Sequence, residues 1–241
     1  MRQIFLTYPF GRHILETGAN LSHSSAQAHS ALHGIYAISD EILTPYALLP
    51  QALESALKAG VRIFQLRDKS HSDEWLLPYA RELMAICACH NALFVLNDRL
   101  ELALELNAPA LHLGRDDVAF KQARKHFGGL LGGSSYGDLA RAKELESMGA
   151  DYVAFGALFP SSTKPNAPLA PLEILSRAKD ELQIPICAIG GISAHNIHLL
   201  KKADMWAVIS SLWGGGACGG DSARWCGEVE DNVRALRAGF A

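Results

Sequence analysis

The feature that most constrains the fold is an alternation of two kinds of segment, repeated eight times from Gly34 onward. Short runs rich in Ile, Val, Leu and Phe alternate with longer segments whose apolar residues recur at helical spacing. The short runs are continuously apolar, which predicts strands covered on both faces, as in a parallel sheet. These strands are predicted at 35–39, 62–66, 93–96, 110–114, 130–134, 152–156, 185–190 and 206–210. The helices are predicted at 47–60, 73–90, 99–107, 118–127, 138–149, 170–182, 194–202 and 222–238.

Eight successive strand–helix units predict a closed (β/α)8 barrel, the TIM barrel of the α/β class. The chain has 241 residues, and such a barrel commonly uses about 250 residues as a single domain. The alternative is an open doubly wound sheet, which should carry a glycine-rich dinucleotide turn after its first strand. The residues after the first predicted strand, 40–43, are Asp-Glu-Ile-Leu without glycine. This favours the barrel.

The first 33 residues differ from the rest, being rich in Ser, His, Ala and Asn without clear periodicity. We interpret 1–33 as an N-terminal extension of unassigned role, and 34–241 as a single barrel domain.

Charge and composition narrow the function classes. The 22 Lys and Arg residues are balanced by 25 Asp and Glu, for a net charge of −3, which argues against a nucleic-acid or membrane surface. No apolar stretch approaches the roughly 18 residues of a membrane span. Pro9 and Gly11 interrupt the only N-terminal apolar segment, unlike in a signal peptide. Five scattered cysteines without a CxxC pair indicate free thiols. We therefore expect a cytoplasmic protein.

Polar residues gather directly after the predicted strands, where the loops of a barrel build its active site. They are Gln65, Arg67, Asp68 and Lys69; Asn97 and Asp98; His112, Arg115, Asp116 and Asp117; Ser134 and Ser135; Ser161, Ser162, Thr163 and Lys164; Gly190 and Gly191; and Ser210 and Ser211. Taken singly, Asp98 and Asp117 could be helix caps, a lone lysine is more often a surface charge, and His112 is more often a satisfied core or rim residue than a ligand. Their shared position after strands favours a site.

The chemistry of this set predicts two anionic ligands. Carboxylates without a His/Cys cluster suit Mg²⁺, which usually takes one or two protein carboxylates and fills its shell with water and phosphate oxygens. Neighbouring Lys and Arg would neutralise further phosphate charge. The turns at Gly190–Gly191 and Ser210 follow the seventh and eighth strands, where barrels commonly bind a phosphate monoester. No nucleophile motif is present, so electrostatic stabilisation of a leaving group is the simplest mechanism.

Seven motifs in this order resemble the thiamine phosphate synthase family from about Gly34 to Trp213. They are QLRDK (65–69), NDR (97–99), HLGRDD (112–117), GGSS (132–135), DYVAFGALFPSSTK (151–164), AIGGI (188–192) and VISS (208–211). AIGGI alone is a weak signal, because many phosphate-binding barrels carry a similar turn. The whole set is specific.

The resemblance implies a transferase of thiamine biosynthesis. Such an enzyme joins 4-amino-2-methyl-5-hydroxymethylpyrimidine diphosphate to 4-methyl-5-(2-phosphooxyethyl)thiazole, and it releases thiamine phosphate and diphosphate in a Mg²⁺-dependent reaction. It also implies a dissociative displacement, in which diphosphate leaves first and the thiazole nitrogen then attacks the pyrimidine methylene cation. The partners expected are these two small molecules, without nucleic acid or membrane.

The resemblance also implies a role for individual residues. The pyrimidine diphosphate would contact Gln65, Arg67, Lys69, Asn97, Ser134 and Lys164. The thiazole phosphate would contact Ser161, Ser162, Thr163, Gly190, Gly191, Ile209 and Ser210. Asp98 and Asp117 would hold Mg²⁺. The residues expected to stabilise the departing diphosphate are Arg67, Lys69, Ser134 and Lys164.

The sequence departs from the family pattern at four places, none of which removes a charge that the chemistry needs. Arg115 stands where Gln is common, Ser161 replaces Thr, and Ala157 replaces a frequent Pro. A glycine-rich run occupies 214–220. Arg115 and this run bear on ligand affinity and loop order more than on reaction type.

Three other functions are considered. A thiazole tautomerase-like relative on the same barrel would not need the retained Lys69, Asp98, Asp117 and Lys164. A non-catalytic binder of thiamine metabolites would bind both substrates without releasing diphosphate. An unrelated sugar-phosphate isomerase would need a general base pair, which is not evident at the strand ends. The segment expected to close over the substrates is 161–170.

Overall fold

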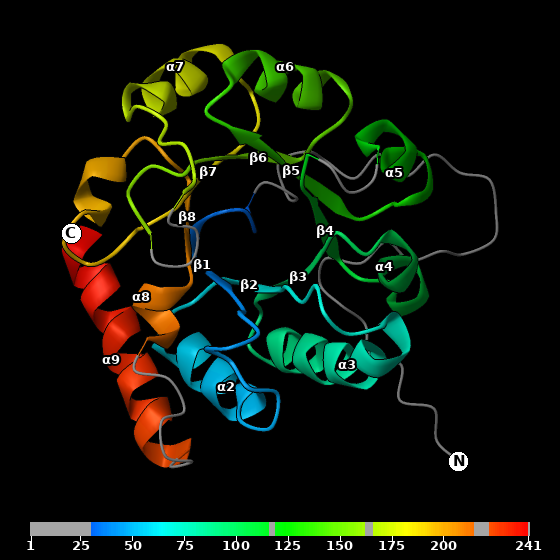
Figure 1. Cartoon of the computed structure of the whole chain (residues 1–241), viewed down its shortest axis with the longest axis vertical. Helices are drawn as coiled ribbons and strands as arrows, with labels where there is room; N and C mark the ends of the chain where they lie inside the picture. The colour runs from blue at the N-terminus through cyan, green and yellow to red at the C-terminus, as the bar shows by residue number, and fades with distance from the viewer. Residues whose placement is uncertain (1–29, 116–118, 162–165, 215–221, 241) are drawn as a thin grey trace.

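The computed structural model describes residues 30–115, 119–161, 166–214 and 222–240. Eight parallel strands form a closed barrel in chain order, with β8 pairing back to β1 (Figure 1). The strands are β1 (Gly34–Ile38), β2 (Ile63–Leu66), β3 (Leu93–Asn97), β4 (Ala110–Leu113), β5 (Leu130–Tyr136), β6 (Tyr152–Phe155), β7 (Ile186–Ile189) and β8 (Met205–Val208). The prediction of a closed (β/α)8 barrel is confirmed.

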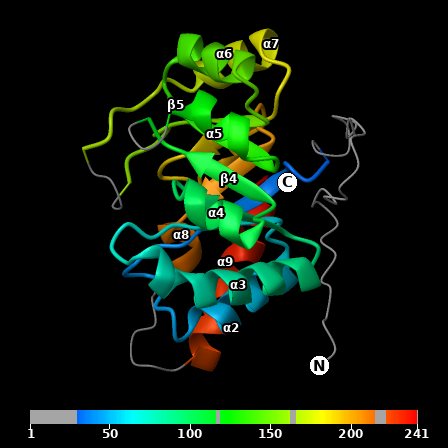
Figure 2. The ribbon, with the colours of Figure 1, turned by 90° about the vertical axis from the view of Figure 1, so that its right-hand side faces the viewer.

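The helices form a ring around the strands, seen end-on in Figure 1 and from the side in Figure 2. They are α2 (Leu49–Ala59), α3 (Asp73–Cys89), α4 (Leu100–Leu106), α5 (Phe120–His126), α6 (Leu139–Ser147), α7 (Glu173–Glu181), the 3-10 turn η1 (Ile197–Leu200), α8 (Ser210–Trp213) and α9 (Ser222–Phe240). Within the described residues, no helix is long and apolar enough to cross a membrane.

The structure differs from the helical predictions at two places. The helix expected over 194–202 is only the short turn η1, and a four-residue helix, α8, directly follows β8 without having been predicted. The long helix α9 packs against α2 and against both of these short elements, η1 and α8.

Local signals account for where the other helices begin and end. The Ser72 hydroxyl accepts a hydrogen bond from the N–H of Trp75 at the start of α3, and Asp138 accepts from two N–H groups at the start of α6. Helix α2 ends at Gly60, whose φ of 121° is a conformation that glycine adopts readily. The prediction of Gly60 as a helix C-cap is confirmed.

Alternate residues of each strand face the barrel interior or the helices. On β2, Ile63 belongs to the interior cluster, whereas Phe64 and Leu66 pack against the helices. Leu32, from the predicted N-terminal extension, is also buried in the interior cluster. Both faces of each strand are therefore covered, which explains why the strands are apolar throughout.

Candidate active site

A cavity of about 540 Å³ opens at the carboxyl ends of the strands. The predicted site residues that line it are Gln65, Arg67, Lys69, Asn97, Asp98, Ser134, Ser161, Gly190, Gly191, Ile209 and Ser210. Four further predicted residues, Asp117, Ser162, Thr163 and Lys164, lie outside the described residues. The described part of the predicted closing segment also borders the cavity, through residues 167–170. The fold thus brings together residues spread over more than 140 positions of the chain, from Gln65 to Ser210.

Asp98 lies at the rim of this cavity with its carboxylate held from three sides. Its Oδ2 accepts a hydrogen bond of 2.6 Å from the Asn97 side-chain amide and lies 3.2 Å from Lys69 Nζ. Its Oδ1 accepts from the Gly114 N–H at 3.1 Å. The carboxylate does not cap α4, whose N-cap residue is Arg99 and which has no side-chain cap. The interpretation of Asp98 as a helix cap is therefore wrong.

The donor chemistry at this rim fits a hard divalent cation. Among the described residues, no group of three or more His, Cys, Asp or Glu side chains could hold a metal ion. Mg²⁺ does not need such a group, because it commonly binds one or two carboxylates and completes its shell with water and substrate phosphate. A single cavity-lining carboxylate beside a lysine is consistent with that mode.

A chain of buried hydrogen bonds crosses the barrel interior beneath the cavity. Gln65 Nε2 donates to the Tyr36 hydroxyl at 2.6 Å, and the Tyr36 and Tyr152 hydroxyls share a hydrogen bond of 2.9 Å. The Tyr152 hydroxyl lies 3.0 Å from His112 Nδ1, and His112 Nε2 lies 3.0 Å from Ser134 Oγ. Two predicted substrate-contacting residues are thus joined through three buried side chains.

With Gln65 Nε2 donating to Tyr36, one arrangement of protons gives every member of this chain a partner. Burial lowers the pKa of His112 to about 4, although nearby Asp98 opposes the shift, so its ring is neutral at pH 7 and has one N–H. If Tyr36 donates to Tyr152 and Tyr152 donates to Nδ1, then Nε2–H donates to Ser134. The reverse order would leave the buried Tyr36 proton without an acceptor among the described side chains. Ser134 therefore keeps its own hydroxyl hydrogen free to donate into the cavity.

Sequence reasoning missed Tyr36 and Tyr152 as parts of the site. Both lie within apolar strands and are almost fully buried, so their pattern matches that of ordinary core aromatics. The interpretation of His112 as a satisfied core or rim residue agrees with its two hydrogen-bonded ring nitrogens and its place in the cavity lining. A signal that could have revealed the set is the inward position that Gln65, Asn97, His112 and Ser134 each occupy near a strand's carboxyl end.

The opposite end of the cavity is built from backbone. Gly190 and Gly191 have φ values of 100° and 63°. A Cβ on Gly190 would lie 2.5 Å from Ala157 Cα, and one on Gly191 would lie 2.3 Å from the Pro160 carbonyl oxygen. Only glycine fits this close approach. Within the described part of the chain, neither glycine N–H has a hydrogen-bond partner.

The segment after β8 completes this end. Ile209 and Ser210 line the cavity, and Ser210 begins α8. The indole N–H of Trp213 donates to the Ile38 carbonyl at 2.7 Å, which ties α8 to the end of β1. The Ser211 hydroxyl is buried and has no partner among the described residues.

Arg115, one of the departures from the family pattern, lies at the mouth of the cavity. Its guanidinium carbon lies 4.6 Å from the centre of the Tyr136 ring, in a cation–π contact. Both residues line the cavity, so arginine at this position, in place of the family's common Gln, adds a cation at the cavity mouth.

Comparison with known proteins assigns the family. The model of a family described as thiamine monophosphate synthase matches residues 35–212, which is most of the chain. The chain belongs to the thiamine monophosphate synthase family. The family assigns it the synthesis of thiamine phosphate, a group transfer of thiamine biosynthesis between small-molecule substrates.

Individual members of the thiamine monophosphate synthase family match this chain over most of their length. The thiamine-phosphate synthase of Wolinella succinogenes is 48% identical over 190 residues, covering 77% of this chain and 87% of that protein. That of Thioalkalivibrio sulfidiphilus is 41% identical over 186 residues, covering 76% and 88%. The solved thiamine phosphate pyrophosphorylase from Pyrococcus furiosus superposes with a TM-score of 0.72 at 29% identity, covering 86% of this chain and 98% of that one.

Proposed function

We propose that this chain joins 4-amino-2-methyl-5-hydroxymethylpyrimidine diphosphate to 4-methyl-5-(2-phosphooxyethyl)thiazole, releasing diphosphate, with Mg²⁺ as cofactor. The observation that carries the proposal is a single cavity lined by cationic side chains at one end and by a glycine turn with a serine at the other. Arg67, Lys69 and Asp98 line one end, and the Gly190–Gly191 turn with Ser210 lines the other. Two phosphorylated substrates that react with each other need such an arrangement.

The diphosphate would bind at the ends of β2 and β3. Arg67 and Lys69 provide positive charge there, and Lys164 would add a third cation. Ser134 supports the same role, because a hydroxyl that accepts from His112 Nε2 still has its own hydrogen to donate. Gln65 and Asn97 present amide groups suited to the polar edge of the pyrimidine.

Mg²⁺ would be held by Asp98 and Asp117, and it would neutralise part of the diphosphate charge. Support comes from the oxygen donors of Asp98, which lines the cavity beside Lys69. The pairing of Lys69 with Asp98 at 3.2 Å also keeps that lysine close to where a bound diphosphate would lie.

The thiazole phosphate would bind at the ends of β7 and β8. The N–H groups of Gly190 and Gly191 are donors suited to a phosphate monoester. Ser210 and Ser161 add hydroxyls at the same end of the cavity. Ser162, Thr163 and Ile209 complete the proposed contacts.

The reaction breaks the bond between the pyrimidine methylene carbon and the diphosphate oxygen, and the electron pair leaves with diphosphate. The thiazole nitrogen then forms a bond to that carbon. Arg67, Lys69 and Lys164 stabilise the negative charge that develops on the leaving group, and Ser134 donates a hydrogen bond to it. The cavity holds the second substrate in position, which removes much of the entropic cost of the encounter.

One assay separates this proposal from its alternatives. Purified protein is given both substrates with and without Mg²⁺, and thiamine phosphate and diphosphate are measured. We expect equal amounts of both products, formed only with Mg²⁺. Binding of both substrates without diphosphate release would instead indicate a metabolite binder, and isomerisation of the thiazole phosphate alone would indicate a tautomerase-like enzyme.

We also propose that residues 34–241 form the catalytic domain, behind an extension at 1–33, and that the protein acts in the cytoplasm. The cysteines support the location, since the four that are described are free thiols. Cell fractionation tests the location. Assay of a chain that begins at residue 30, which keeps the buried Leu32, tests the domain boundary.

A further inference from the structure

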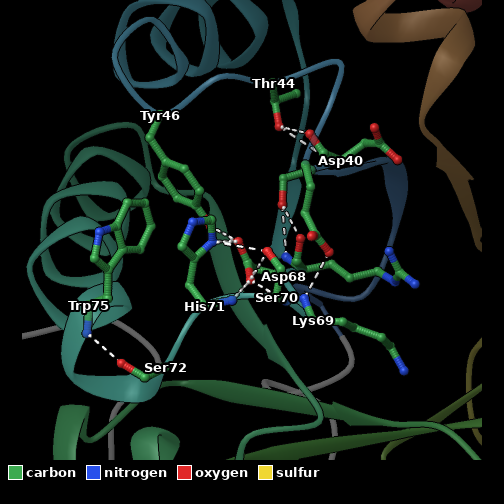
Figure 3. A network of polar contacts seen from close by, with 12 residues as sticks. Asp40, Thr44, Tyr46, Asp68, Lys69, Ser70, His71, Ser72 and Trp75 are labelled. Atoms are coloured by element: carbon green, nitrogen blue, oxygen red, sulfur yellow. Dashed lines mark hydrogen bonds and ion pairs between the residues drawn. The ribbon is translucent and has the colours of Figure 1, made fainter.

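Successive side chains of the loop between β2 and α3 alternate between the cavity and the protein interior. Arg67 and Lys69 line the cavity, whereas the Asp68 side chain between them is completely buried. Figure 3 shows Lys69 extending away from the group formed by Asp68, His71 and Tyr46. A buried carboxylate between two cavity-lining cations needs a reason, because burying a charge is costly unless it is well paired.

The Asp68 carboxylate is surrounded by donors, as Figure 3 shows. Its Oδ1 accepts hydrogen bonds from the N–H groups of Ser70 at 2.9 Å and His71 at 2.8 Å. Its Oδ2 accepts from the Tyr46 hydroxyl at 2.8 Å and lies 2.8 Å from His71 Nδ1. Burial by itself would raise the pKa of Asp68, but the hydrogen bonds from His71, Tyr46 and Ser70 outweigh it and lower the pKa to about 2. The group is therefore charged at neutral pH.

Arg99 connects this loop to the next one around the barrel. Its guanidinium donates to the Asp68 carbonyl at 2.9 Å and 3.2 Å, and to the His71 carbonyl at 2.7 Å. It also pairs with Asp73 at the start of α3. Arg99 directly follows Asn97 and Asp98 in the sequence, so its contacts tie the loop of Arg67 and Lys69 to the loop of Asn97 and Asp98.

A third loop holds the backbone of the two cations. The Ser39 hydroxyl accepts a hydrogen bond from the Arg67 N–H at 2.8 Å and donates to the Arg67 carbonyl at 3.2 Å. Glu41 accepts from the Lys69 N–H at 2.8 Å. With the Asp68 and Arg99 contacts, most of the backbone polar groups from Arg67 to His71 have a defined partner.

We propose that Asp68 and Arg99 are positioning residues that lock the β2–α3 loop to the β3–α4 loop, so that Arg67 and Lys69 are held beside Asp98 at the diphosphate end of the cavity. The inference rests on the proposed function for what Arg67, Lys69 and Asp98 bind. It gives a role to two residues of the QLRDK and NDR motifs that no substrate contact explains. A merely structural clamp would stabilise the fold without affecting one substrate more than the other.

The chain offers a matched control at the opposite end of the barrel. Asp151 precedes β6, accepts a hydrogen bond from the Leu131 N–H at 2.7 Å and pairs with Arg124 at 2.9 Å. Arg124, like Arg99, also donates to a loop carbonyl, that of Gly129, at 2.8 Å. Asp151 does not line the cavity. Asp68→Asn and Asp151→Asn therefore each remove one carboxylate charge beside an arginine that also binds a loop carbonyl, 3.7 Å from Arg99 in the first case and 2.9 Å from Arg124 in the second.

The first readout is steady-state kinetics with each substrate varied in turn. For Asp68→Asn we expect kcat/KM for the pyrimidine diphosphate to fall on the order of tenfold to a hundredfold, as is usual when supporting contacts are lost. The KM for the thiazole phosphate should stay within about twofold, because its proposed site lies across the barrel. Asp151→Asn should retain wild-type kinetics. Equal kinetics for the two variants would overturn the proposal.

The second readout does not need activity. Amide hydrogen exchange of residues 67–71 should be faster in Asp68→Asn than in wild type, and unchanged in Asp151→Asn. Unchanged exchange in this loop would refute the clamp, whether or not the wild-type protein is active. An inactive wild-type protein would by itself refute only the proposed function. Should Asp68→Asn fail to fold, Tyr46→Phe removes one donor to Oδ2 and should produce the same selective loss of kcat/KM, only smaller. A Tyr46→Phe protein with wild-type kinetics and exchange would then overturn the proposal.

Discussion

Two Asp–Arg clamps lie at opposite ends of the described barrel. Comparing them shows how similar groups can serve different purposes. At the amino end, Asp151 and Arg124 satisfy the Leu131 N–H and the Gly129 carbonyl, away from the cavity. At the carboxyl end, Asp68 accepts hydrogen bonds from two loop N–H groups and Arg99 donates to the Asp68 carbonyl, next to residues that line the cavity. The first clamp joins the ends of neighbouring strands. The second also sets the position of charged side chains.

The same contrast extends to other groups of the two ends. Asp204, which precedes β8, accepts from the Ile186 N–H and pairs with Lys179 at 2.7 Å. Asp98, which follows β3, accepts from the Gly114 N–H and pairs with Lys69. We expect substitutions at the amino end to affect stability, and those at the carboxyl end to affect turnover as well.

The largest expected effect is that of Asp98→Ala. Removing the carboxylate should reduce kcat/KM on the order of a hundredfold or more and shift the Mg²⁺ dependence to higher concentration, because a proposed ligand is lost. A Mg²⁺ titration of initial rates measures both changes. The amino-end counterpart, Asp204→Ala, should lower the unfolding free energy but keep the Mg²⁺ dependence. A wild-type titration curve for Asp98→Ala would remove Asp98 from the metal site.

A comparable contrast is expected between two glycines. Gly191→Ala places a Cβ against the Pro160 carbonyl in a turn of positive φ. It should raise the KM for the thiazole phosphate by about tenfold or more, because the N–H donors of this turn are displaced. Gly60→Ala, at the amino end, also has a positive φ, but the atoms nearest to the new Cβ belong to the flexible Arg237 side chain. It should cost about 1 kcal/mol of stability without changing either KM.

A smaller effect is expected where the interior joins the site. Tyr152→Phe interrupts the hydrogen-bond chain and removes the constraint that makes Ser134 a donor. We expect kcat to fall by about tenfold, and the unfolding free energy by about 1–3 kcal/mol, since buried partners lose a hydrogen bond. A double-mutant cycle tests the connection: in a Ser134→Ala background, Tyr152→Phe should have little further effect on kcat. Additive losses would show that the chain does not act through Ser134.

The smallest effect concerns acid stability. The folded-state pKa of Asp68, about 2, is below the value near 4 expected in the unfolded chain. Its charge therefore stabilises the fold by up to about 2 kcal/mol above pH 4, and this stabilisation is lost as the pH falls toward 2. Denaturant unfolding of wild type and Asp68→Asn at pH 7 and pH 3 measures it. The difference between the two proteins should shrink at pH 3, and a constant difference would contradict the assigned pKa.

Much of the fold could be predicted because the barrel imposes a simple pattern on its strands. Burial on both faces requires continuous apolar runs, and all eight strands were found where such runs occur. The failures are at α8 and η1, two short elements that pack against the distant helix α9. That packing is not a local property of 194–213, so no local pattern could reveal it.

The candidate site was predictable in part for a related reason. Residues directly after strands must lie at one end of the barrel, and Gln65, Asn97 and Ser134 do line the cavity there. Their roles in binding stay predictions. What the pattern could not show is which neighbouring side chains face the cavity. Asp68 lies between Arg67 and Lys69 in the sequence, yet its side chain faces away from the cavity that they line. Tyr36 and Tyr152 were hidden because a buried hydroxyl and a plain core ring have the same sequence pattern.

The central claim is that the cavity at the carboxyl ends catalyses the transfer, with Mg²⁺ and both substrates present together. The most direct measurement follows thiamine phosphate and diphosphate in the same reaction, for the wild type and for Lys69→Ala. The account predicts equal amounts of the two products from the wild type, dependence on both substrates and on Mg²⁺, and a loss on the order of a hundredfold in Lys69→Ala. Absence of both products from the wild type, or an unimpaired Lys69→Ala protein, would contradict it.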